Sequence, residues 1–256
     1  MTRLSIIIIT KNEEENLPRC LESVKWADEV VIVDSHSTDR TAEIAAKYGC
    51  KIFTRDWPGY GAAKQFALEQ ATGEWVLSLD ADEAVSNELH SEIAGLLQRP
   101  DLCDAYYIPR RTNFLGRWIL HCGWYPDYLI RLFKRTHGRF DLAVVHEGVV
   151  VEGTTGKLRH DLLHFSYPTL EKYFQKFNRY TTLGAQEALR NGKRAGWFDI
   201  VMRPPVCFVK HYVTKRGFLD GLEGFVLSAL SATAVLVKYA KLWQLTRKTS
   251  GVKTTV

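Results

Sequence analysis

The sequence predicts an α/β fold with a doubly wound, mostly parallel sheet, followed by a basic helical appendage. Short β-branched runs alternate with segments of helical period through the first hundred residues. The runs are apolar on both faces, as are strands of a parallel sheet that helices cover on both sides. The 256 residues are 46% hydrophobic and 25% charged, an ordinary globular composition that excludes a disordered or collagen-like chain.

Each element of the first hundred residues has its own signal. Strands are predicted over 4–10, 29–34, 51–54 and 74–80, and helices over 13–25, from the cap at 38–39 to 48, and over 61–71. Leu17, Leu21 and Val24 lie at helical spacing and predict the first helix. Thr38 and Asp39 are residue types that cap a helix and predict where the second begins.

The second part of the chain has looser patterns. Strand-like segments are expected over 105–111, 128–134 and 144–151, then a long amphipathic helix over 169–191 and a mostly helical stretch over 210–244. Net charge is +5, but residues 193–256 carry +8 and the remainder −3. We therefore divide the chain into a main domain, 1–192, and a basic tail, 193–256. The total charge is too small to argue for nucleic-acid binding.

Cysteine usage and the N-terminus indicate a reducing compartment. Five cysteines without a C-x-x-C pair indicate neither a zinc ribbon nor a disulfide framework. The apolar run 4–9 is too short and too soon followed by charge for a signal peptide. No run reaches about 18 consecutive apolar residues, the nearest being 225–237. We expect a cytoplasmic chain that does not span a membrane.

Acidic residues follow two of the predicted strands, where the loops of a doubly wound sheet converge. Asp80 and Asp82 are separated by one residue after a buried strand, and such a pair can hold Mg²⁺ or Mn²⁺ against a diphosphate. Asp34 ends another buried strand, where it can accept from a uracil N3–H or a ribose hydroxyl. Alternatively, Asp34 and Asp39 cap the next helix.

A glycine-containing segment, 59–64, offers a possible phosphate contact. Its glycines permit close approach of a backbone, and Lys64 can meet a phosphate. The alternative is a lysine that is simply solvated on a helix surface.

These motifs together resemble glycosyltransferase family 2, the inverting nucleotide-sugar enzymes of the GT-A fold. The resemblance covers about residues 1–100, with the opening segment 5–14, the stretch 31–41, the glycine and lysine segment and the D-x-D in the family's order. It implies nucleoside contacts by Thr10, Asn12, Glu13 and Asp34, a base or phosphate contact by Lys64, and ribose and metal contacts by Asp80 and Asp82. Of the two aspartates, Asp82 is the preferred metal ligand.

The second half resembles a narrower subgroup, the lipopolysaccharide core-biosynthesis glucosyltransferases. The similar segments are 131–134, 145–147, 164–167 and 203–205. This resemblance implies transfer of glucose from UDP-glucose onto a lipid-anchored core oligosaccharide. A polyprenyl phosphate or another glycan is the alternative acceptor.

An inverting transfer needs a base that takes the proton of the acceptor hydroxyl. The acidic pair that the family commonly places after the D-x-D is absent here. We expect Glu147 to be the base, with His146 and Asp127 as alternatives, although His146 is equally consistent with a buried structural histidine. His164 is a candidate additional metal ligand.

The basic tail combines lysines and arginines with aromatic residues. That combination suits a helix lying in anionic headgroups, and equally a packed helical hairpin with a solvated edge. The expected location is therefore cytoplasmic, peripheral at the inner membrane. Two other function classes stay open: a sugar nucleotidyltransferase, which should have a glycine-rich loop after the first strand that is missing here, and a non-enzymatic membrane-surface module.

Overall fold

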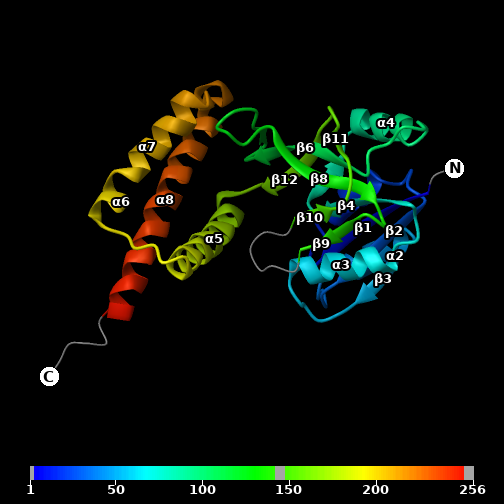
Figure 1. The fold of residues 1–256 in the computed structure, drawn as a ribbon, viewed down its shortest axis with the longest axis horizontal. Coiled ribbons are helices and arrows are strands. Elements are labelled where there is room, and N and C mark those ends of the chain that lie inside the picture. The colour runs from blue at the N-terminus through cyan, green and yellow to red at the C-terminus, as the bar shows by residue number, and fades with distance from the viewer. Residues whose placement is uncertain (1–2, 142–147, 251–256) are drawn as a thin grey trace. The chain divides into compact units, whose positions relative to one another are not determined.

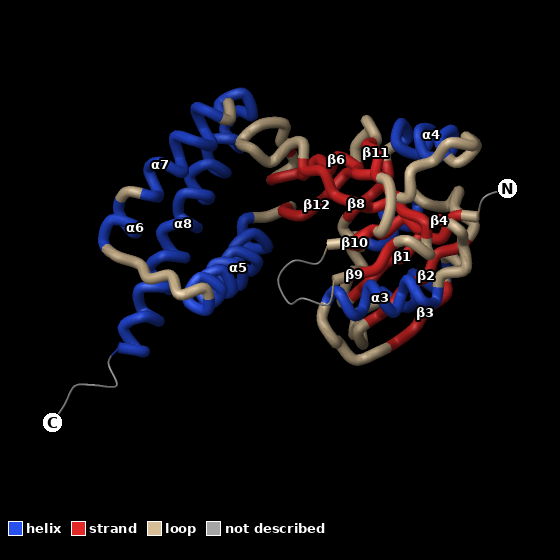
Figure 2. Tube along the Cα trace, in the orientation of Figure 1, coloured by secondary structure: helices blue, strands red, loops and turns tan. Residues whose placement is uncertain are grey.

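The protein is described by a computed structural model covering residues 3–141 and 148–250, with side chains to residue 247 (Figures 1 and 2). It has two compact units, one formed by Met1–Arg111 and Pro126–Phe165, the other by Thr112–Tyr125 and Ser166–Val256. The boundary predicted near residue 192 lies inside the second unit, between α5 (Leu170–Arg190) and α6 (Trp197–Val201). The division of labour implied by that boundary stays a prediction.

The first unit is built on a large mixed sheet in the order β3-β2-β1-β4-β8-β6-β12-β5. Its strands are β1 (Leu4–Thr10), β2 (Glu29–Asp34), β3 (Lys51–Thr54), β4 (Trp75–Asp80), β5 (Glu83–Val85), β6 (Ala105–Phe114), β8 (Asp127–Lys134) and β12 (Leu162–Tyr167). Two short strands, β7 (Arg117–Trp118) and β11 (Thr155–Lys157), pair with β6. A separate pair consists of β9 (Gly138–Phe140) and β10 (Val149–Val151).

The predicted parallel arrangement is confirmed for the first four strands. β1 pairs in parallel with β2 and with β4, and β2 pairs in parallel with β3. In this register Thr10 lies opposite Asp34, and Ile9 lies opposite Asp80. The carboxyl ends of β1, β2 and β4 therefore meet at one edge, which brings the polar residues that follow them together.

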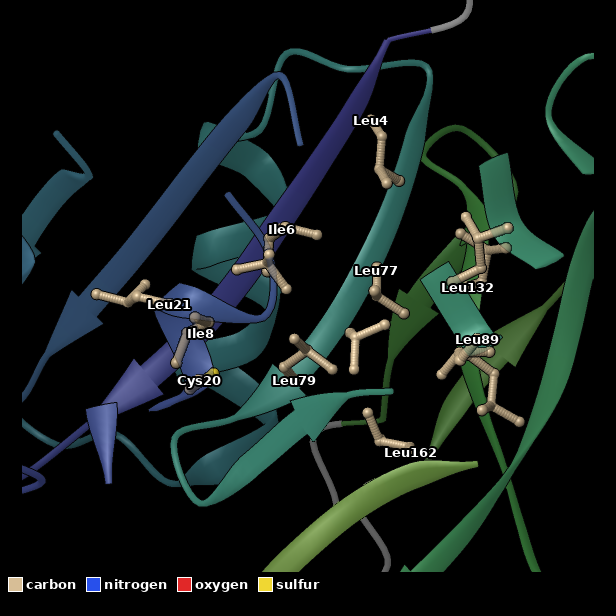
Figure 3. Close-up of a cluster of buried hydrophobic side chains, with 14 of the residues drawn as sticks. Leu4, Ile6, Ile8, Cys20, Leu21, Leu77, Leu79, Leu89, Leu132 and Leu162 are labelled. Carbon is tan, nitrogen blue, oxygen red and sulfur yellow. The ribbon is translucent and has the colours of Figure 1, made fainter. Parts of the chain in front are cut away.

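Helices cover both faces of these parallel strands. They are α1 (Leu17–Glu22), α2 (Thr41–Lys47), α3 (Tyr60–Gln70) and α4 (Asn87–Leu96). Successive β1 residues point to opposite faces. Ile8 therefore joins the core cluster that contains Leu21 and Leu89 (Figure 3), while Ile7 packs with Ala67 of α3 in a second cluster. Burial on both faces explains why the strand reads as a continuous apolar run.

Several elements differ from the sequence prediction. The first helix is limited to α1, because the chain up to Asn16 forms turns and Pro18 lies in the first helical turn. β5 and α4 were not predicted, although Ser86 caps α4 by accepting from the Leu89 N–H. In the predicted strand 144–151, only β10 lies within the described residues.

The second unit is mostly helical, although it also includes β7 and the ends of β6 and β12. It contains α5, α6, α7 (Arg203–Val209), η1 (Lys210–Thr214), η2 (Gly217–Asp220) and α8 (Gly221–Ser250). Figure 1 shows α6 and α7 alongside α8, which packs against both of them and against α5.

Within the described residues, the helical stretch Gly217–Arg247 is long and apolar enough to cross a bilayer. About 22% of its most apolar window is buried in the protein. Counting consecutive apolar residues does not reveal this stretch, because serine and threonine interrupt the apolar run without lowering its average hydropathy enough. That the chain does not span a membrane stays a prediction.

Candidate active site

The buried carboxylate of Asp34 is held by neighbouring donors at the end of β2. Thr10 Oγ1 donates to its Oδ1 at 2.9 Å, and the Ser37 N–H donates to its Oδ2 at 2.9 Å. Asp34 and Thr10 are each 2% exposed. These bonds offset the cost of burying the charge. Neither Asp34 nor Asp39 is the N-cap of α2, which is Arg40 without a side-chain cap bond; Asp39 lies one residue earlier and accepts from the Thr41 N–H at 3.0 Å.

The loop after β1 is tied to the loop after β2. Asn12 has a left-handed backbone, with φ of 56°, which asparagine adopts more readily than most residues. Its Oδ1 accepts from the Thr38 N–H at 2.8 Å, and its own N–H donates to Ser37 Oγ at 2.8 Å. The Glu13 N–H donates to Thr41 Oγ1 at 2.8 Å. Asn12 and Glu13 therefore have a structural role, because they hold the two loops together at the carboxyl edge of the sheet.

A chain of alternating charges begins at the end of β4. Lys64 Nζ lies 2.7 Å from Asp80 Oδ1, and Arg131 Nη2 lies 2.7 Å from Asp80 Oδ2. Lys64 and Arg131 are each only 6% exposed. Burial favours the neutral form of Asp80, but attraction by Arg131 and Lys64 outweighs it and holds the pKa of this carboxyl well below its usual value. Asp80 is therefore ionised with a cation against each oxygen.

The same chain continues through residues that the sequence analysis did not single out. Glu83 Oε1 accepts from Arg131 at 2.7 Å and from Arg110 at 3.2 Å, and its Oε2 accepts from the Asp80 N–H at 2.9 Å. The side chain of Glu83 has no exposed surface. Arg110 in turn donates to Asp127 at 2.7 Å. Glu83 thus links the backbone of the D-x-D turn to two arginines.

Asp82 and His164 lie close together although 82 positions separate them. His164 Nε2 is 3.4 Å from Asp82 Oδ2, and their side chains are 12% and 18% exposed. The Phe165 N–H donates to the Asp82 carbonyl at 2.8 Å, so β12 fixes the D-x-D turn through the backbone. Imidazole and carboxylate are both ligands for Mn²⁺-like cations.

Within residues 3–141 and 148–250, no three His, Cys, Asp or Glu side chains are grouped to hold a metal by themselves. A cation at Asp82 and His164 would need further oxygens. Mg²⁺ and Mn²⁺ commonly take those from water and substrate phosphates, so the donor set fits a cation that binds together with a diphosphate.

A cavity of about 390 Å³ opens beside this charged chain. Lys64, Asp80, Arg110 and Arg131 line it together with Tyr128. All of these residues belong to the first unit. The cavity is large enough for part of a nucleotide sugar or saccharide and presents both charges and an aromatic face.

The three base candidates have different outcomes. Glu147 and His146 lie outside the described residues, although Gly148 and Val149, which follow them, line the cavity. Asp127 is described, and its carboxylate pairs with Arg110. Which of the three takes the proton stays a prediction.

Comparison with known proteins agrees with this architecture. The model of glycosyl transferase family 2 matches residues 5–148. The lipopolysaccharide core biosynthesis glycosyltransferase LpsC of Rhizobium meliloti is 35% identical over 253 residues, which cover 94% of this chain and 92% of that protein. The chain belongs to glycosyl transferase family 2.

Other relatives extend the same picture. An uncharacterized glycosyltransferase of Rickettsia typhi is 32% identical, with 98% of this chain and 90% of the relative covered. The mannosyltransferase PcManGT from Pyrobaculum calidifontis, solved with GDP-Man and Mn²⁺, shares the fold with a TM-score of 0.51 at 18% identity, covering 98% of this chain and 80% of that one. The predicted GT-A-like α/β fold is confirmed.

Family membership makes this protein a glycosyltransferase. It sets aside the two alternative classes, the sugar nucleotidyltransferase and the non-enzymatic membrane module. The residues missed by sequence analysis, Glu83 and Arg110, gave only one weak signal, an acidic residue directly after the D-x-D. Their partnership depends on strands that are far apart in sequence.

Proposed function

We propose that this glycosyltransferase moves glucose from UDP-glucose, with inversion, onto the lipid-anchored core oligosaccharide of lipopolysaccharide. The observation that carries the donor half is the meeting of Asp34, Lys64, Asp80 and Asp82 at one edge of the sheet. The acceptor half is supported by the name and high coverage of the Rhizobium meliloti relative and by the motif resemblance. The reaction is assigned to the cytoplasmic face of the inner membrane because its acceptor is held in lipid.

In this proposal the residues at the sheet edge bind the donor. Asp34 accepts from the uracil N3–H, and Thr10 holds that carboxylate in place. Lys64 and Arg131 keep Asp80 ionised and oriented, so that Asp80 accepts from ribose hydroxyls. Asp82 and His164 together hold a divalent cation. A bound cation supplies positive charge that offsets the negative charge of the leaving diphosphate.

The transfer exchanges one bond at the anomeric carbon for another. The acceptor hydroxyl oxygen forms a bond to that carbon on the face opposite the diphosphate. The bond from the carbon to the diphosphate oxygen breaks, and its electron pair leaves with UDP. Glu147, as the proposed base, takes the hydroxyl proton.

A donor and acceptor panel tests the proposal. Purified protein is incubated with UDP-glucose, UDP-galactose, UDP-N-acetylglucosamine or GDP-mannose and with truncated lipopolysaccharide, with and without EDTA. We expect transfer from UDP-glucose that EDTA abolishes and added Mn²⁺ restores. Transfer only from another donor would overturn the sugar assignment, and transfer only to polyprenyl phosphate would overturn the acceptor assignment.

A further inference from the structure

The second unit exposes an unusual number of large apolar side chains on its first helices after α5. Six of them are each more than half exposed, and we call them the α6–α7 apolar surface: Trp197, Phe198, Val201, Val206, Val209 and Val213. Scattered exposed apolar residues are normal, but large apolar side chains exposed together along consecutive helices mark a candidate interaction site.

Packing within the unit explains why these side chains point outward. Phe208 of α7 and Tyr212 of η1 contact Phe225 of α8 with ring centroids 5.7 Å and 5.6 Å apart. Val209 and Val213 each follow one of these aromatic residues by one position, so the helical repeat turns them away from α8 and leaves them exposed. α8 therefore covers one side of α7 and η1, and the α6–α7 apolar surface is the uncovered side.

The charges around this surface have one dominant sign. Residues 193–222 contain six lysines and arginines and only two acidic residues. Both acidic side chains already have a basic partner: Asp199 lies 2.6 Å from Arg203, and Asp220 lies 2.9 Å from His121. By contrast, Lys210, Lys215 and Arg216 are exposed, and none of them forms an ion pair within the described part of the chain.

We propose that the α6–α7 apolar surface, with Lys210, Lys215 and Arg216 beside it, docks on an anionic phospholipid surface. Apolar side chains enter the headgroup and acyl boundary while nearby cations meet lipid phosphates, as in interfacial helices. Lys210, Lys215 and Arg216 belong to the basic tail for which the sequence already suggested membrane contact, and the structure narrows that suggestion to one side of α6, α7 and η1. Lys241 is engaged inside the unit, donating to Asn178, Thr181 and Thr182 of α5.

The proposal is independent of the sugar chemistry. It adds to the proposed function the surface through which the enzyme reaches a membrane that holds its acceptor. Vesicle binding needs neither donor nor acceptor, so failure of the transfer assay and failure of this proposal are separate results.

Binding of the full-length chain to vesicles tests it. Phosphatidylcholine vesicles with and without 30% phosphatidylglycerol are compared by flotation. We expect binding to the anionic vesicles that weakens on the order of a hundredfold when Lys210, Lys215 and Arg216 are replaced by glutamine. The matched control replaces Lys25, Lys47 and Arg99, exposed residues of the first unit, by glutamine and should leave binding unchanged.

The apolar part is tested by replacing Trp197, Val201, Val206 and Val209 with serine. We expect at least a tenfold loss of binding, while serine at Leu170 and Leu236, which are 43% and 40% exposed elsewhere in the unit, leaves binding unchanged. Circular dichroism and the melting temperature confirm that each variant is folded. Equal binding of the two serine variants would overturn the proposal.

Quenching of tryptophan fluorescence by brominated lipid tails identifies which helix enters the bilayer. We expect Trp197→Phe to remove most of the quenching and Trp243→Phe, on α8, to remove little. The reverse result would mean that α8 inserts and would overturn the proposal. So would a soluble dimer that the serine replacements on this surface dissociate, in a chain that does not bind vesicles.

Discussion

Arg131 and Asp80 form a buried ion pair across the sheet, with Nη2 of Arg131 2.7 Å from Oδ2 of the aspartate that opens the D-x-D. The arginine comes from β8, which pairs antiparallel with β4, and it also contacts Glu83. The first acid of the motif is thereby anchored to the protein, whereas Asp82 lies beside His164. The two aspartates therefore have different surroundings and are expected to have different tasks.

Removing the charge of Arg131 should destabilise the first unit. Arg131→Met leaves Asp80 and Glu83 facing each other without their shared cation, and breaking a buried pair in this way costs about 3–5 kcal/mol. Arg131→Lys should recover only part of this, because the shorter lysine side chain does not place its ammonium where Nη2 of Arg131 contacts both carboxylates. Urea unfolding measures the loss, with the exposed Arg139→Lys as control. A change below about 1 kcal/mol for Arg131→Met would contradict the buried pair.

Glu83 is expected to act as a positioning residue for the D-x-D turn. Glu83→Gln removes the charge that holds Arg110 and Arg131 and weakens the bond to the Asp80 N–H. We expect kcat/KM to fall by about 10- to 100-fold, the range of one or two lost charged hydrogen bonds. The Mn²⁺ concentration for half-maximal activity should rise as well, which a general loss of stability would not cause. Glu88→Gln, at an exposed position of α4, is the control.

Asp82 and His164 should differ from Asp80 in their effect on metal. We expect Asp82→Ala to lower activity by about two orders of magnitude or more. The activity that remains should no longer depend on Mn²⁺. His164→Ala should weaken Mn²⁺ affinity by about 10- to 100-fold with recovery at high metal concentration. Calorimetric titration of Mn²⁺ in the presence of UDP measures both. Unchanged Mn²⁺ binding by His164→Ala would remove the histidine from the site.

The three base candidates can be separated by kinetics. We expect Glu147→Gln to lower kcat by about 10²- to 10⁴-fold with little change in donor KM, the usual loss for a general base. Asp127→Asn should lower kcat less, because its carboxylate is already paired with Arg110. Rates measured from pH 5 to 9 should lose their acidic limb in the variant that lacks the base. If His146→Gln alone removes that limb, the histidine is the base.

Glu29 should make stability depend on acid pH. Burial raises the pKa of the Glu29 carboxyl, but its hydrogen-bond donors outweigh that effect and lower the pKa from 4.5 to about 2. The carboxylate accepts hydrogen bonds from Lys51, Ser5 and the Thr72 N–H. Because the folded pKa is the lower one, the stabilisation is present above pH 4.5 and is lost as the pH falls toward 2.

We expect Glu29→Gln to lower the free energy of unfolding by about 3 kcal/mol at pH 7 and by little near pH 2. Urea unfolding at several pH values measures this. The exposed Glu74→Gln serves as control and should show no such dependence. A loss that is equal at both pH values would show that the packing of Glu29, and not its charge, is what matters.

The sequence by itself determined the parallel strands β1 to β4 and the polar residues at their ends. These features are local: a run that is apolar on both faces must be covered on both faces, and the residues after it must lie at the sheet edge. Asp34, Lys64 and Asp80 could be named for that reason. β5 was not found, because a three-residue strand has too few positions to show a period. α4 was missed although its cap residue Ser86 and its buried Leu89, Ile93 and Leu96 carry a local signal.

Only the tertiary structure decided the partners of these residues. Arg131 and His164 reach the D-x-D and the adjacent Glu83 from strands whose neighbours are set by antiparallel pairing over long sequence separations, and no local pattern encodes that pairing. The same holds for the tail, where sequence favoured an apolar helix without indicating its uncovered side. That side depends on which residues α8 buries, and packing of α7 against α8 leaves Val206, Val209 and Val213 outside.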